Sequence, residues 1–485
     1  MDQPVERTVE ASALFAGGDD SVSTDVRLSI KDGLIVSIET PTSVTGGARR
    51  FILPSPINAH DHARPTASSF GAIGQPLETW ILRTVLGTPP DPYLQAAVSL
   101  ARSARSGCAA VMVHYTRPSG RKPIVDEAAE IARAAKDVGV RLAFALSVRD
   151  QNPLVYGDAE PLLASLAQSD RDVLERLFVH KPPTPRAYIG LIEEIAARIA
   201  GPMVDVQLGP AGVQWCSLPL LEAIAAHSAS SGRRIHMHLL ETVYQRAWAD
   251  QAFPQGIVRR LDEIGLLTNR LTLAHCVHAR PDELDLIASR GVRIVTNASS
   301  NLHLHSGVGP IASAYQRGGA IAVGIDGLAL DEDDDIIREM RLVHLMHGGT
   351  GFKRTWSSAE FYSHIIASGR RVTGAPGAGR LEIGAAADFI VVDLDRLDRD
   401  AILPVDPLDL LFARGNMSHV AETVVAGRSI MKDGAVIGVD LPALEAELRQ
   451  LYRAQVPRHA DFQDTWRRSE QVFGRWFQQQ CGCGC

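Results

Sequence analysis

Short runs of alternating apolar and polar residues open the chain, and turn residues separate them. The runs are residues 8–16, 26–30, 34–39 and 50–53. Alternation with a period of two is typical of strands that have one buried face. Lys31-Asp32-Gly33 lies between two of these runs, and Asp-Gly in that position is a strong hairpin signal. The pattern predicts a half-sheet that is too small to enclose a core by itself.

A different pattern follows from residue 54 to about residue 373, where short apolar runs alternate with helical stretches. The helical stretches are rich in Ala, Arg and Glu and include residues 93–106, 125–138, 218–231 and 280–290. Between the helical stretches lie apolar runs with the length of strands, which end near His62, His114, Ser147, Gln207, His238, His275, Thr296 and Asp326. Strands that alternate with helices in this way predict a (β/α)8 barrel, whose active site lies at the carboxyl ends of its strands.

Strand-like runs return at residues 388–393, 420–426 and 428–439, and we expect them to complete the opening half-sheet. The predicted fold class is therefore α/β, a (β/α)8 TIM-type barrel (54–373) with a small β-sandwich domain built from both chain ends (1–53 and 374–440). Residues 441–485 are expected to form a helical tail with apolar anchors such as Trp466 and Phe473. The Cys-Gly alternation of residues 481–485 has the composition of a soft-metal tract, but a frayed terminus is the simpler interpretation.

Composition narrows the class of protein. The 485 residues carry a formal net charge of −7 and are 45% hydrophobic, which suffices for a large core and more than one domain. The acidic balance argues against nucleic acid or an anionic membrane as the main partner. No apolar run is long enough to cross a bilayer, and the first residues lack the pattern of a signal peptide. Because the six cysteines are also too sparse for a disulfide framework, we expect a cytoplasmic globular protein.

Side chains that can bind a metal stand at the predicted carboxyl ends of four strands. His60 and His62 occupy alternate positions of the first strand, so both can face the barrel interior. His238, His275 and Asp326 lie at the ends of the fifth, sixth and eighth strands. A His-x-His pair alone is most often a solvated loop or packed core. Imidazoles and a carboxylate from separate strands, however, are ligands that a catalytic divalent metal accepts.

Five motifs surround these residues. They are His60-Asp-His62, His238-Leu-Leu-Glu241, Ala274-His275-Cys-Val-His278, Ser300-Asn301-Leu302 with Ser306-Gly307, and Gly324-Ile-Asp326-Gly327. Together they resemble the amidohydrolase superfamily, in particular its cytosine-deaminase-like and chlorotriazine-hydrolase-like aminohydrolases. The resemblance extends over nearly the whole chain.

The resemblance implies that His60, His62 and His238 hold the metal, with Asp326 as a further ligand. Zinc is favoured, and Fe(II) is the alternative that the same ligands accept. The resemblance also implies that Glu241 moves a proton between the attacking water and a substrate nitrogen, and that His275 polarises the substrate or steadies the hydroxide. Relatives with two metals carry a carboxylated lysine on the fourth strand. Residues 204–210 contain no lysine, which favours one metal per chain.

The implied reaction is hydrolysis of a C–N bond other than a peptide bond, with deamination of a small nitrogen heterocycle or cyclic amidine favoured. A metal lowers the pKa of bound water to about 7. Expulsion of an amine needs a proton, which a carboxylic acid such as Glu241 delivers when burial raises its pKa. The alternatives are hydrolysis of an amide, urea or carbamate, displacement of another leaving group, and, outside enzymes, a metal-free scaffold barrel. We expect a homodimer or higher homo-oligomer whose partners are a small molecule and water.

Several further residues are candidates for contact with the substrate. Trp80, on a loop after the first strand, would suit a flat heterocycle, although core packing explains it equally well. Gln207 and Gln214 offer amides that read the edge of a ring. His114 ends the second strand, and the residues favour a substrate contact and a structural role about equally.

Two candidates lie where the chain departs from the pattern of its relatives. Asn301 belongs to the seventh-strand motif, which opens with Thr296-Asn297 in this chain. The same motif in relatives often opens with His or Cys. Asp331 begins an acidic run where relatives often carry an Asn pair. Stabilisation of the following helix through its dipole is the default interpretation of that run, and selection of a basic substrate is the alternative. These departures leave the identity of the substrate open.

Overall fold

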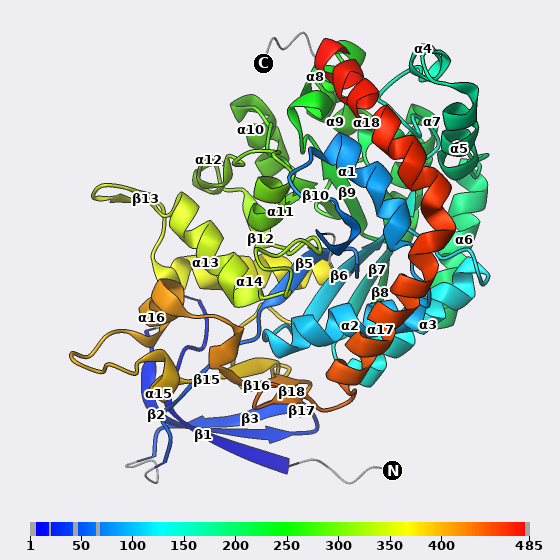
Figure 1. The fold of residues 1–485 in the computed structure, drawn as a ribbon. Helices are drawn as coiled ribbons and strands as arrows, with labels where there is room; N and C mark the ends of the chain where they lie inside the picture. The colour runs from blue at the N-terminus through cyan, green and yellow to red at the C-terminus, as the bar shows by residue number, and fades with distance from the viewer. Residues whose placement is uncertain (1–5, 19–20, 42–46, 65–67, 481–485) are drawn as a thin grey trace.

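Eight parallel strands form the centre of the molecule. The structure is a computed structural model that describes residues 6–18, 21–41, 47–64 and 68–480. The strands follow one another around the barrel in chain order: β5 (Ile57–Asp61), β6 (Ala110–Tyr115), β7 (Arg141–Val148), β8 (Val204–Pro210), β9 (Ile235–Leu239), β10 (Leu271–His275), β11 (Arg293–Thr296) and β12 (Ala320–Val323). Figure 1 shows helices packed around this central sheet.

The first and last strands meet through the segment that follows β12. The backbone N–H groups of Ile325 and Asp326 both donate to the carbonyl of His60, at 3.1 and 2.8 Å. Gly324 makes this approach possible, because a Cβ there would lie 2.7 Å from the backbone nitrogen of His60 and 2.5 Å from Oδ1 of Asn297. A side chain at position 324 would therefore force the seam of the barrel apart.

Helices connect successive strands and cover the outside of the barrel. In chain order the helices are α1 (Leu77–Arg83), α2 (Pro92–Arg105), α3 (Ile124–Val138), α4 (Glu160–Ala164), α5 (Gln168–Phe178), α6 (Pro185–Ile199), α7 (Leu218–Ser231), α8 (Val243–Ala252), α9 (Ile257–Glu263), α10 (Pro281–Ser289), α11 (Ala298–His303), α12 (Ile311–Gln316), α13 (Ile336–His347), α14 (Ser358–Thr373), α15 (Leu394–Leu397), α16 (Pro407–Arg414), α17 (Leu441–Gln455) and α18 (Ala460–Gln480). Short 3-10 turns are η1 (Ser68–Phe70), η2 (Thr84–Gly87), η3 (Val213–Trp215), η4 (Met417–His419) and η5 (Val456–His459).

Helix α7 shows how the local sequence sets a helix's limits. Ser217 caps its first turn, because the hydroxyl accepts a hydrogen bond of 3.3 Å from the N–H of Leu220. The helix ends at Gly232, whose φ of +76° is the left-handed conformation that glycine adopts without strain. The predicted helix at residues 218–231 has the same limits.

A second sheet combines strands from both ends of the chain. Its order is β18 (Ala435–Val436), β17 (Arg428–Lys432), β16 (Val420–Val425), β15 (Phe389–Asp393), β4 (Arg50–Pro54), β1 (Glu6–Leu14), β2 (Ser23–Lys31) and β3 (Leu34–Glu39). Strand β4 lies at its middle, antiparallel to β15 and parallel to β1. The sheet folds back on itself. The backbone of Gly33 and Ile35, at the start of β3, forms hydrogen bonds with the backbone of residues 384–387, which precede β15. The sheet lies at one end of the barrel (Figure 1).

A buried ion-pair network joins this sheet to the barrel. Asp388, just before β15, accepts hydrogen bonds from Arg141 on β7 at 3.0 Å and from Arg370 on α14 at 2.8 Å. All three side chains are less than a tenth exposed. The N–H of Ala426 also donates to Asp388, at 2.7 Å. This single carboxylate therefore neutralises two buried guanidinium groups between two parts of the fold.

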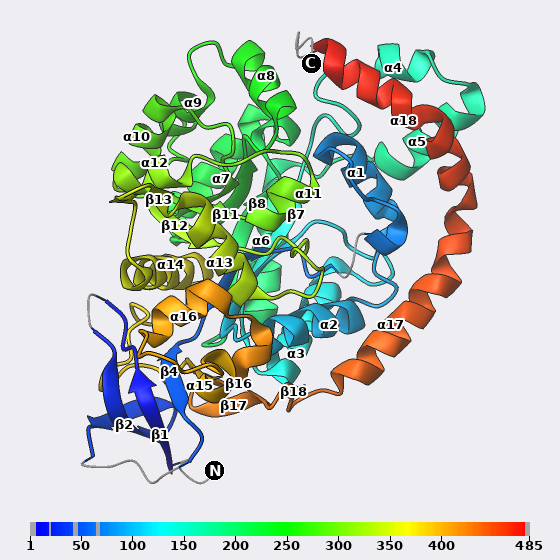
Figure 2. The ribbon, with the colours of Figure 1, turned by 60° about the vertical axis from the view of Figure 1, so that its left-hand side comes forward.

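The last two helices run along one side of the barrel toward its active face. Figure 2 shows α17 and α18 as an arch that passes α5 and ends beside α4. Helix α18 also contacts α1 and α8. Phe462, Trp466 and Phe473 of α18 are buried in an apolar cluster that also contains Leu77 and Trp80 of α1. These helices thus support a helix that faces the candidate active site.

The predicted fold class is confirmed, with local differences. Strand β12 ends at Val323 and not at Asp326, because the chain turns at Gly324 to cross β5. Helices α4–α6 between β7 and β8 were not among the predicted segments, and residues 481–485 lie outside the described chain.

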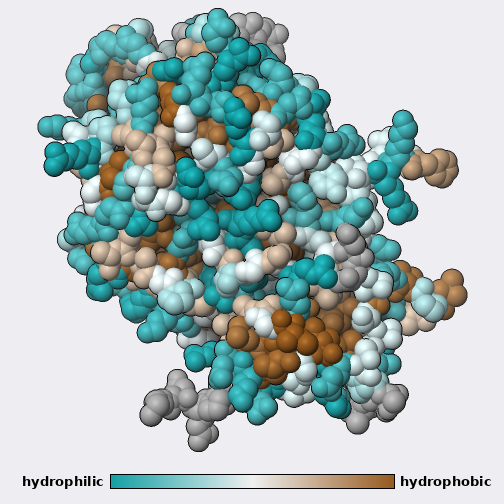
Figure 3. All heavy atoms as spheres, turned by 180° about the vertical axis from the view of Figure 1, so that it is seen from behind, coloured by the Kyte–Doolittle hydropathy of each residue, from teal (hydrophilic) through white to brown (hydrophobic). Residues whose placement is uncertain are grey.

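Seen from behind, the largest apolar area of the surface lies at the level of the second sheet (Figure 3). Among the described residues, no helix is both long enough and apolar enough to span a bilayer.

Candidate active site

Four buried side chains converge at the carboxyl ends of β5, β9 and β12. They are His60, His62, His238 and Asp326, whose ligand atoms all lie within 4.8 Å of one another. Oδ1 of Asp326 lies 3.1 Å from Nε2 of His60 and 3.0 Å from Nε2 of His62. Nε2 of His238 lies 3.4 Å from Nε2 of His62. In the part of the chain that the structure describes, no second group of side chains meets the same geometric conditions for a metal ion.

The other ring nitrogen of each histidine is occupied by a neighbour. Nδ1 of His62 and Nδ1 of His238 each lie 2.7 Å from a backbone carbonyl, so both must carry the proton and donate it. Nδ1 of His60 lies 2.8 Å from Nε2 of His236 and is the donor in the tautomer that leaves Nε2 of His60 without a proton. In these tautomers His60, His62 and His238 each present an Nε2 lone pair toward the centre of the group.

This arrangement fits a divalent cation. Nε2 of His60 and Oδ1 of Asp326 are buried and have no hydrogen-bond partner among the described residues. Burial lowers the pKa of His62 to about 3 and the pKa of His238 well below its ordinary value, which keeps both imidazoles neutral. Neutral imidazoles and a carboxylate are a donor set that suits zinc or Fe(II).

Glu241 and His275 lie beside this group. Oε2 of Glu241 is 3.6 Å from Nε2 of His275, which is itself 4.0 Å from Oδ2 of Asp326. Nδ1 of His275 lies 2.9 Å from Oδ1 of Asn301 and donates to it. Burial lowers the pKa of His275 to about 4, so Nε2 faces Glu241 and Asp326 as an unprotonated acceptor at neutral pH.

The two carboxylates differ in their electrostatic surroundings. Burial, and then the charges of Asp326 and Glu78, raise the pKa of Glu241 well above its ordinary value. Burial would also raise the pKa of Asp326, but the imidazoles of His60 and His62 outweigh it and hold that pKa well below its usual range. Their surroundings therefore favour the protonated form of Glu241 and the ionised form of Asp326.

The backbone at two of these residues is strained. His275 has φ +74° and Asp326 has φ +61°, in the left-handed region that residues other than glycine rarely adopt. Asp326 is held there by its N–H bond to His60 and by Ser300, whose hydroxyl donates to Oδ2 at 2.5 Å. Strain of this kind is common at active sites, where the surrounding structure fixes the direction of a side chain.

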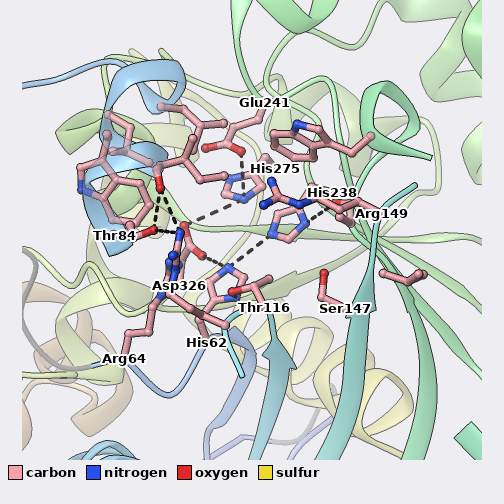
Figure 4. A pocket seen from close by; sticks show the side chains of 18 of the residues that line it. His62, Arg64, Thr84, Thr116, Ser147, Arg149, His238, Glu241, His275 and Asp326 are labelled. Atoms are coloured by element: carbon pink, nitrogen blue, oxygen red, sulfur yellow. Dashed lines mark hydrogen bonds and ion pairs between the residues drawn. The ribbon is translucent and has the colours of Figure 1, made fainter. Parts of the chain in front are cut away.

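A cavity of about 240 Å³ opens above these residues. Its lining includes His62, His238, Glu241, His275 and Asp326. Figure 4 shows these side chains pointing toward one another, with Arg64 and Arg149 beside them. A cavity of this size accommodates a small molecule and not a polymer.

Two of the predicted substrate contacts lie at or next to the cavity. Trp80 lines it, with the guanidinium of Arg64 5.0 Å from the centre of its indole ring. Asn301 lies behind His275 and fixes its ring, so its side chain is directed at the imidazole and not at the cavity. Trp215 forms a further part of the cavity wall.

The structure does not bring the other four candidates into the lining. His114 is fully buried beneath the metal-binding group and lies 3.1 Å from the carbonyl of Gly209. Gln207 lies deep in the barrel because β8 continues to Pro210, and its amide donates to the carbonyl of Val372. Gln214 is buried in the loop after β8. Asp331 is exposed and pairs with Arg338 on α13.

Three arginines of the lining were not among the predicted site residues. Arg64, Arg117 and Arg149 follow β5, β6 and β7 within three residues. Their positions just after strand ends are the signal that could have identified them, since the active residues of such barrels lie there.

Comparisons with known proteins agree with this architecture. A family model described as "Amidohydrolase family" matches residues 51–430. The 5-methylthioadenosine/S-adenosylhomocysteine deaminase of Nitratidesulfovibrio vulgaris (strain DSM 19637 / Miyazaki F) is 26% identical over 466 residues, which are 93% of this chain and 98% of that protein.

Two solved structures have the same fold. An adenosine deaminase from Xanthomonas campestris with bound zinc has a TM-score of 0.75 and 21% identity, over 93% of this chain and 98% of that one. The atrazine chlorohydrolase of Arthrobacter aurescens TC1, complexed with zinc, has a TM-score of 0.73 and 22% identity, over 92% and 99% of the two chains.

Proposed function

Because the chain belongs to the amidohydrolase family, we propose that it deaminates a small nitrogen heterocycle or a cyclic amidine by metal-dependent hydrolysis. The observation that carries the proposal is the pair formed by Glu241 and Asp326. Both carboxyl groups line one cavity, and their surroundings move the two pKa values in opposite directions. An acid and a base held side by side are what hydrolysis of an amidine C–N bond requires. The deaminase name of a full-length relative supports the same reaction.

The side chains divide the proton transfers between them. As the attacking water adds to the ring carbon, Asp326 accepts a proton from the water and Glu241 donates its proton to the adjacent ring nitrogen. As the tetrahedral adduct collapses, Asp326 returns its proton to the amino group, the C–N bond breaks and ammonia departs. The new hydroxyl group gives its proton to Glu241. His275, whose ring Asn301 fixes, offers Nε2 as a free acceptor for the substrate or the water, 3.6 Å from Oε2 of Glu241.

We assign His60, His62, His238 and Asp326 as the residues that hold one divalent metal per chain. Zinc is the preferred ion, since the two similar solved structures are described with it, and Fe(II) is the alternative for the same donor set. When bound, the metal supplies a Lewis acid that makes water nucleophilic at neutral pH.

The second candidate function is hydrolysis that expels a leaving group other than ammonia. The same water attack would hydrolyse an amide, urea or carbamate, and the name of the similar chlorohydrolase indicates that this fold also accepts a halide. The pair of Glu241 and Asp326 favours the amine, because an amine leaves only with a proton, which Asp326 passes to it in this scheme, whereas a halide leaves without one. The metal-free scaffold is disfavoured, because the buried lone pairs of the ligand group have no protein partner among the described residues.

Ammonia release is the direct test. The zinc-loaded protein is incubated with purines, pyrimidines, triazines and guanidino compounds, alongside a Glu241→Gln variant and a sample stripped with chelator. We expect ammonia from at least one ring class, and loss of that activity in both controls. Metal analysis should give one zinc per chain. Activity on amides or carbamates without any ammonia from the rings would overturn the proposal.

We propose that the enzyme is a homodimer or higher homo-oligomer in the cytoplasm. Phe352 is fully exposed at the tip between β13 (Gly349–Thr350) and β14 (Lys353–Arg354), and Ile402 and Leu403 are also largely exposed. Contact with a second copy of the chain would remove such apolar side chains from water. Light scattering on the wild type and on Phe352→Ser should give an oligomer that the substitution weakens. A monomeric wild type would contradict this expectation.

A further inference from the structure

Three arginines line one side of the cavity. Arg64 follows β5, Arg117 follows β6 and Arg149 follows β7, and these strands are neighbours in the barrel. Glu241 follows β9, and Asp326 follows β12, which adjoins β5 at the seam of the barrel. The strands that precede Arg117 and Arg149 are therefore neighbours of neither β9 nor β12.

Two of these arginines have no carboxylate to neutralise them. Neither Arg117 nor Arg149 forms an ion pair with any residue of the described chain. Arg117 donates to Oγ1 of Thr84 at 2.6 Å and to the carbonyl of Ile81 at 3.3 Å, and both acceptors are uncharged. Arg149 forms no hydrogen bond with a described side chain or backbone group. Most of its donors, and several of those of Arg117, remain available.

The positive charges of the three arginines also repel one another. Burial, followed by the neighbouring charges of Arg149 and Arg64, lowers the pKa of Arg117 to about 9. Arg64 differs from the other two, because the carboxylates of Asp326, Asp61 and Glu241 attract it. The uncompensated charge is thus located at Arg117 and Arg149.

Arg117 and Arg149 differ from arginines on the protein surface, whose charges are solvated by water. Two unpaired guanidinium groups beside each other in a concave site repel one another, and the cost falls when an anion binds between them. A guanidinium group presents a planar set of donors that matches a carboxylate or a phosphate in bidentate fashion. The hydroxyl groups of Thr116 and Ser147 in the same lining add neutral donors.

We propose that Arg117 and Arg149 bind an anionic group of the substrate, a carboxylate or a phosphate, while its reacting ring lies against Glu241 and His275. This inference rests on the deaminase function proposed above and names the class of substrate for the same cavity. The substrate is therefore an amino-substituted nitrogen heterocycle that carries a negatively charged substituent. Anchoring that substituent at Arg117 and Arg149 orients the ring toward Glu241 and Asp326.

Binding measurements test the inference without relying on turnover. Calorimetry with the zinc-loaded protein compares benzoate with benzamide and phenyl phosphate with phenol. The proteins are the wild type, Arg149→Gln, Arg117→Gln with Arg149→Gln, and Arg453→Gln, whose exposed arginine on α17 gives a matched change of charge. Metal content is measured for each, because an anion can also bind the zinc.

We expect the wild type and the Arg453→Gln control to bind at least one anion roughly 10- to 100-fold more tightly than its neutral partner. This preference should fall to within about threefold in the double variant and to an intermediate value in Arg149→Gln. The anion whose affinity falls more in the double variant shows whether the anionic group of the substrate is a carboxylate or a phosphate. Equal affinity for charged and neutral probes, or an unchanged preference in the double variant, would overturn the inference.

The two proposals fail in different ways. Arginine-dependent anion binding without ammonia from any ring would reject deamination but retain the anion site. Ammonia from neutral rings, with no arginine-dependent anion binding, would reject the anion site but retain deamination.

Discussion

The imidazoles of His236 and His60 lie parallel to within 9°, with Nε2 of His236 2.8 Å from Nδ1 of His60. His236 does not belong to the candidate metal-binding group, but when it accepts a hydrogen bond from Nδ1 of His60 it leaves the Nε2 lone pair of His60 free to face the centre of that group. Nδ1 of His62 and Nδ1 of His238 instead donate to backbone carbonyls at 2.7 Å, and Oγ1 of Thr116 also lies 3.4 Å from Nδ1 of His62.

Replacing His236 with Leu should therefore weaken metal binding by about 10- to 100-fold, because the orientation of a ligand imidazole depends on the acceptor behind it. Competition with a chromogenic chelator measures the affinity. His278→Leu is the control, since His278 lies outside the metal-binding group and bonds to the carbonyl of Ser306. Equal zinc affinity in both variants would show that His236 has no such role.

Glu241→Gln should lower kcat by about 10²- to 10⁴-fold while the zinc content stays at the wild-type level. The amide occupies the same space but has no acidic proton to give. In the wild type the raised pKa of Glu241 means that the acid form persists above the ordinary carboxyl range and disappears as pH rises through that pKa. Activity should therefore have an alkaline limb that the variant lacks, which a pH profile of kcat would measure.

Glu78→Gln should move that alkaline limb to lower pH. The charge of Glu78 is one of the causes that raise the pKa of Glu241, after burial and Asp326. Burial raises the pKa of Glu78 itself to about 6, so it is ionised at neutral pH and its removal stabilises the ionised form of Glu241. The same pH profile tests this. If the alkaline limb of the pH profile does not move, a group other than Glu241 determines its position.

Asp388→Ala should destabilise the fold by about 3–5 kcal/mol, because it leaves the guanidinium groups of Arg141 and Arg370 buried without a counter-charge. Chemical denaturation measures the loss. Asp395→Ala removes a half-exposed partner of Arg49 and should cost no more than about 1 kcal/mol.

The same carboxylate makes a contribution that depends on pH. Burial opposes ionisation of Asp388, but the two arginines outweigh it, so its pKa in the folded state lies below the ordinary value. Its contribution to stability is therefore complete above the pKa of the unfolded chain and is lost as pH falls through the lower pKa of the folded state. The stabilities of wild type and Asp388→Ala should converge in acid.

Much of the barrel was predictable because its strands are short apolar runs between amphipathic helices. The limits of α7 and β3 agree with the predicted ranges, since both segments are bounded by strong turn or capping residues. The family predicted from the motifs is confirmed by the match over residues 51–430. Position along a strand was harder to predict. Gln207 resembles a strand end in sequence, but the strand continues for three residues and the side chain stays in the barrel interior.

The arginines of the cavity were missed for a different reason. In sequence, Arg117 and Arg149 have the same appearance as the many arginines that pair on the surface, and only the geometry shows that no carboxylate faces them. The absence of a partner depends on residues far apart in the chain, which a local pattern does not contain. Their places after consecutive strands were visible, but the rule about strand ends was applied only to residues with metal-binding or acid–base chemistry.

The central place of β4 in the second sheet has a consequence for biosynthesis. Its neighbour β15 is translated after the whole barrel, on the order of tens of seconds later at typical elongation rates. During that time the apolar edge of β4 has no partner, while β5, which begins three residues after β4 ends, already leads into the barrel. The strand that leads directly into His60 and His62 is therefore among the last to acquire its native neighbours during synthesis.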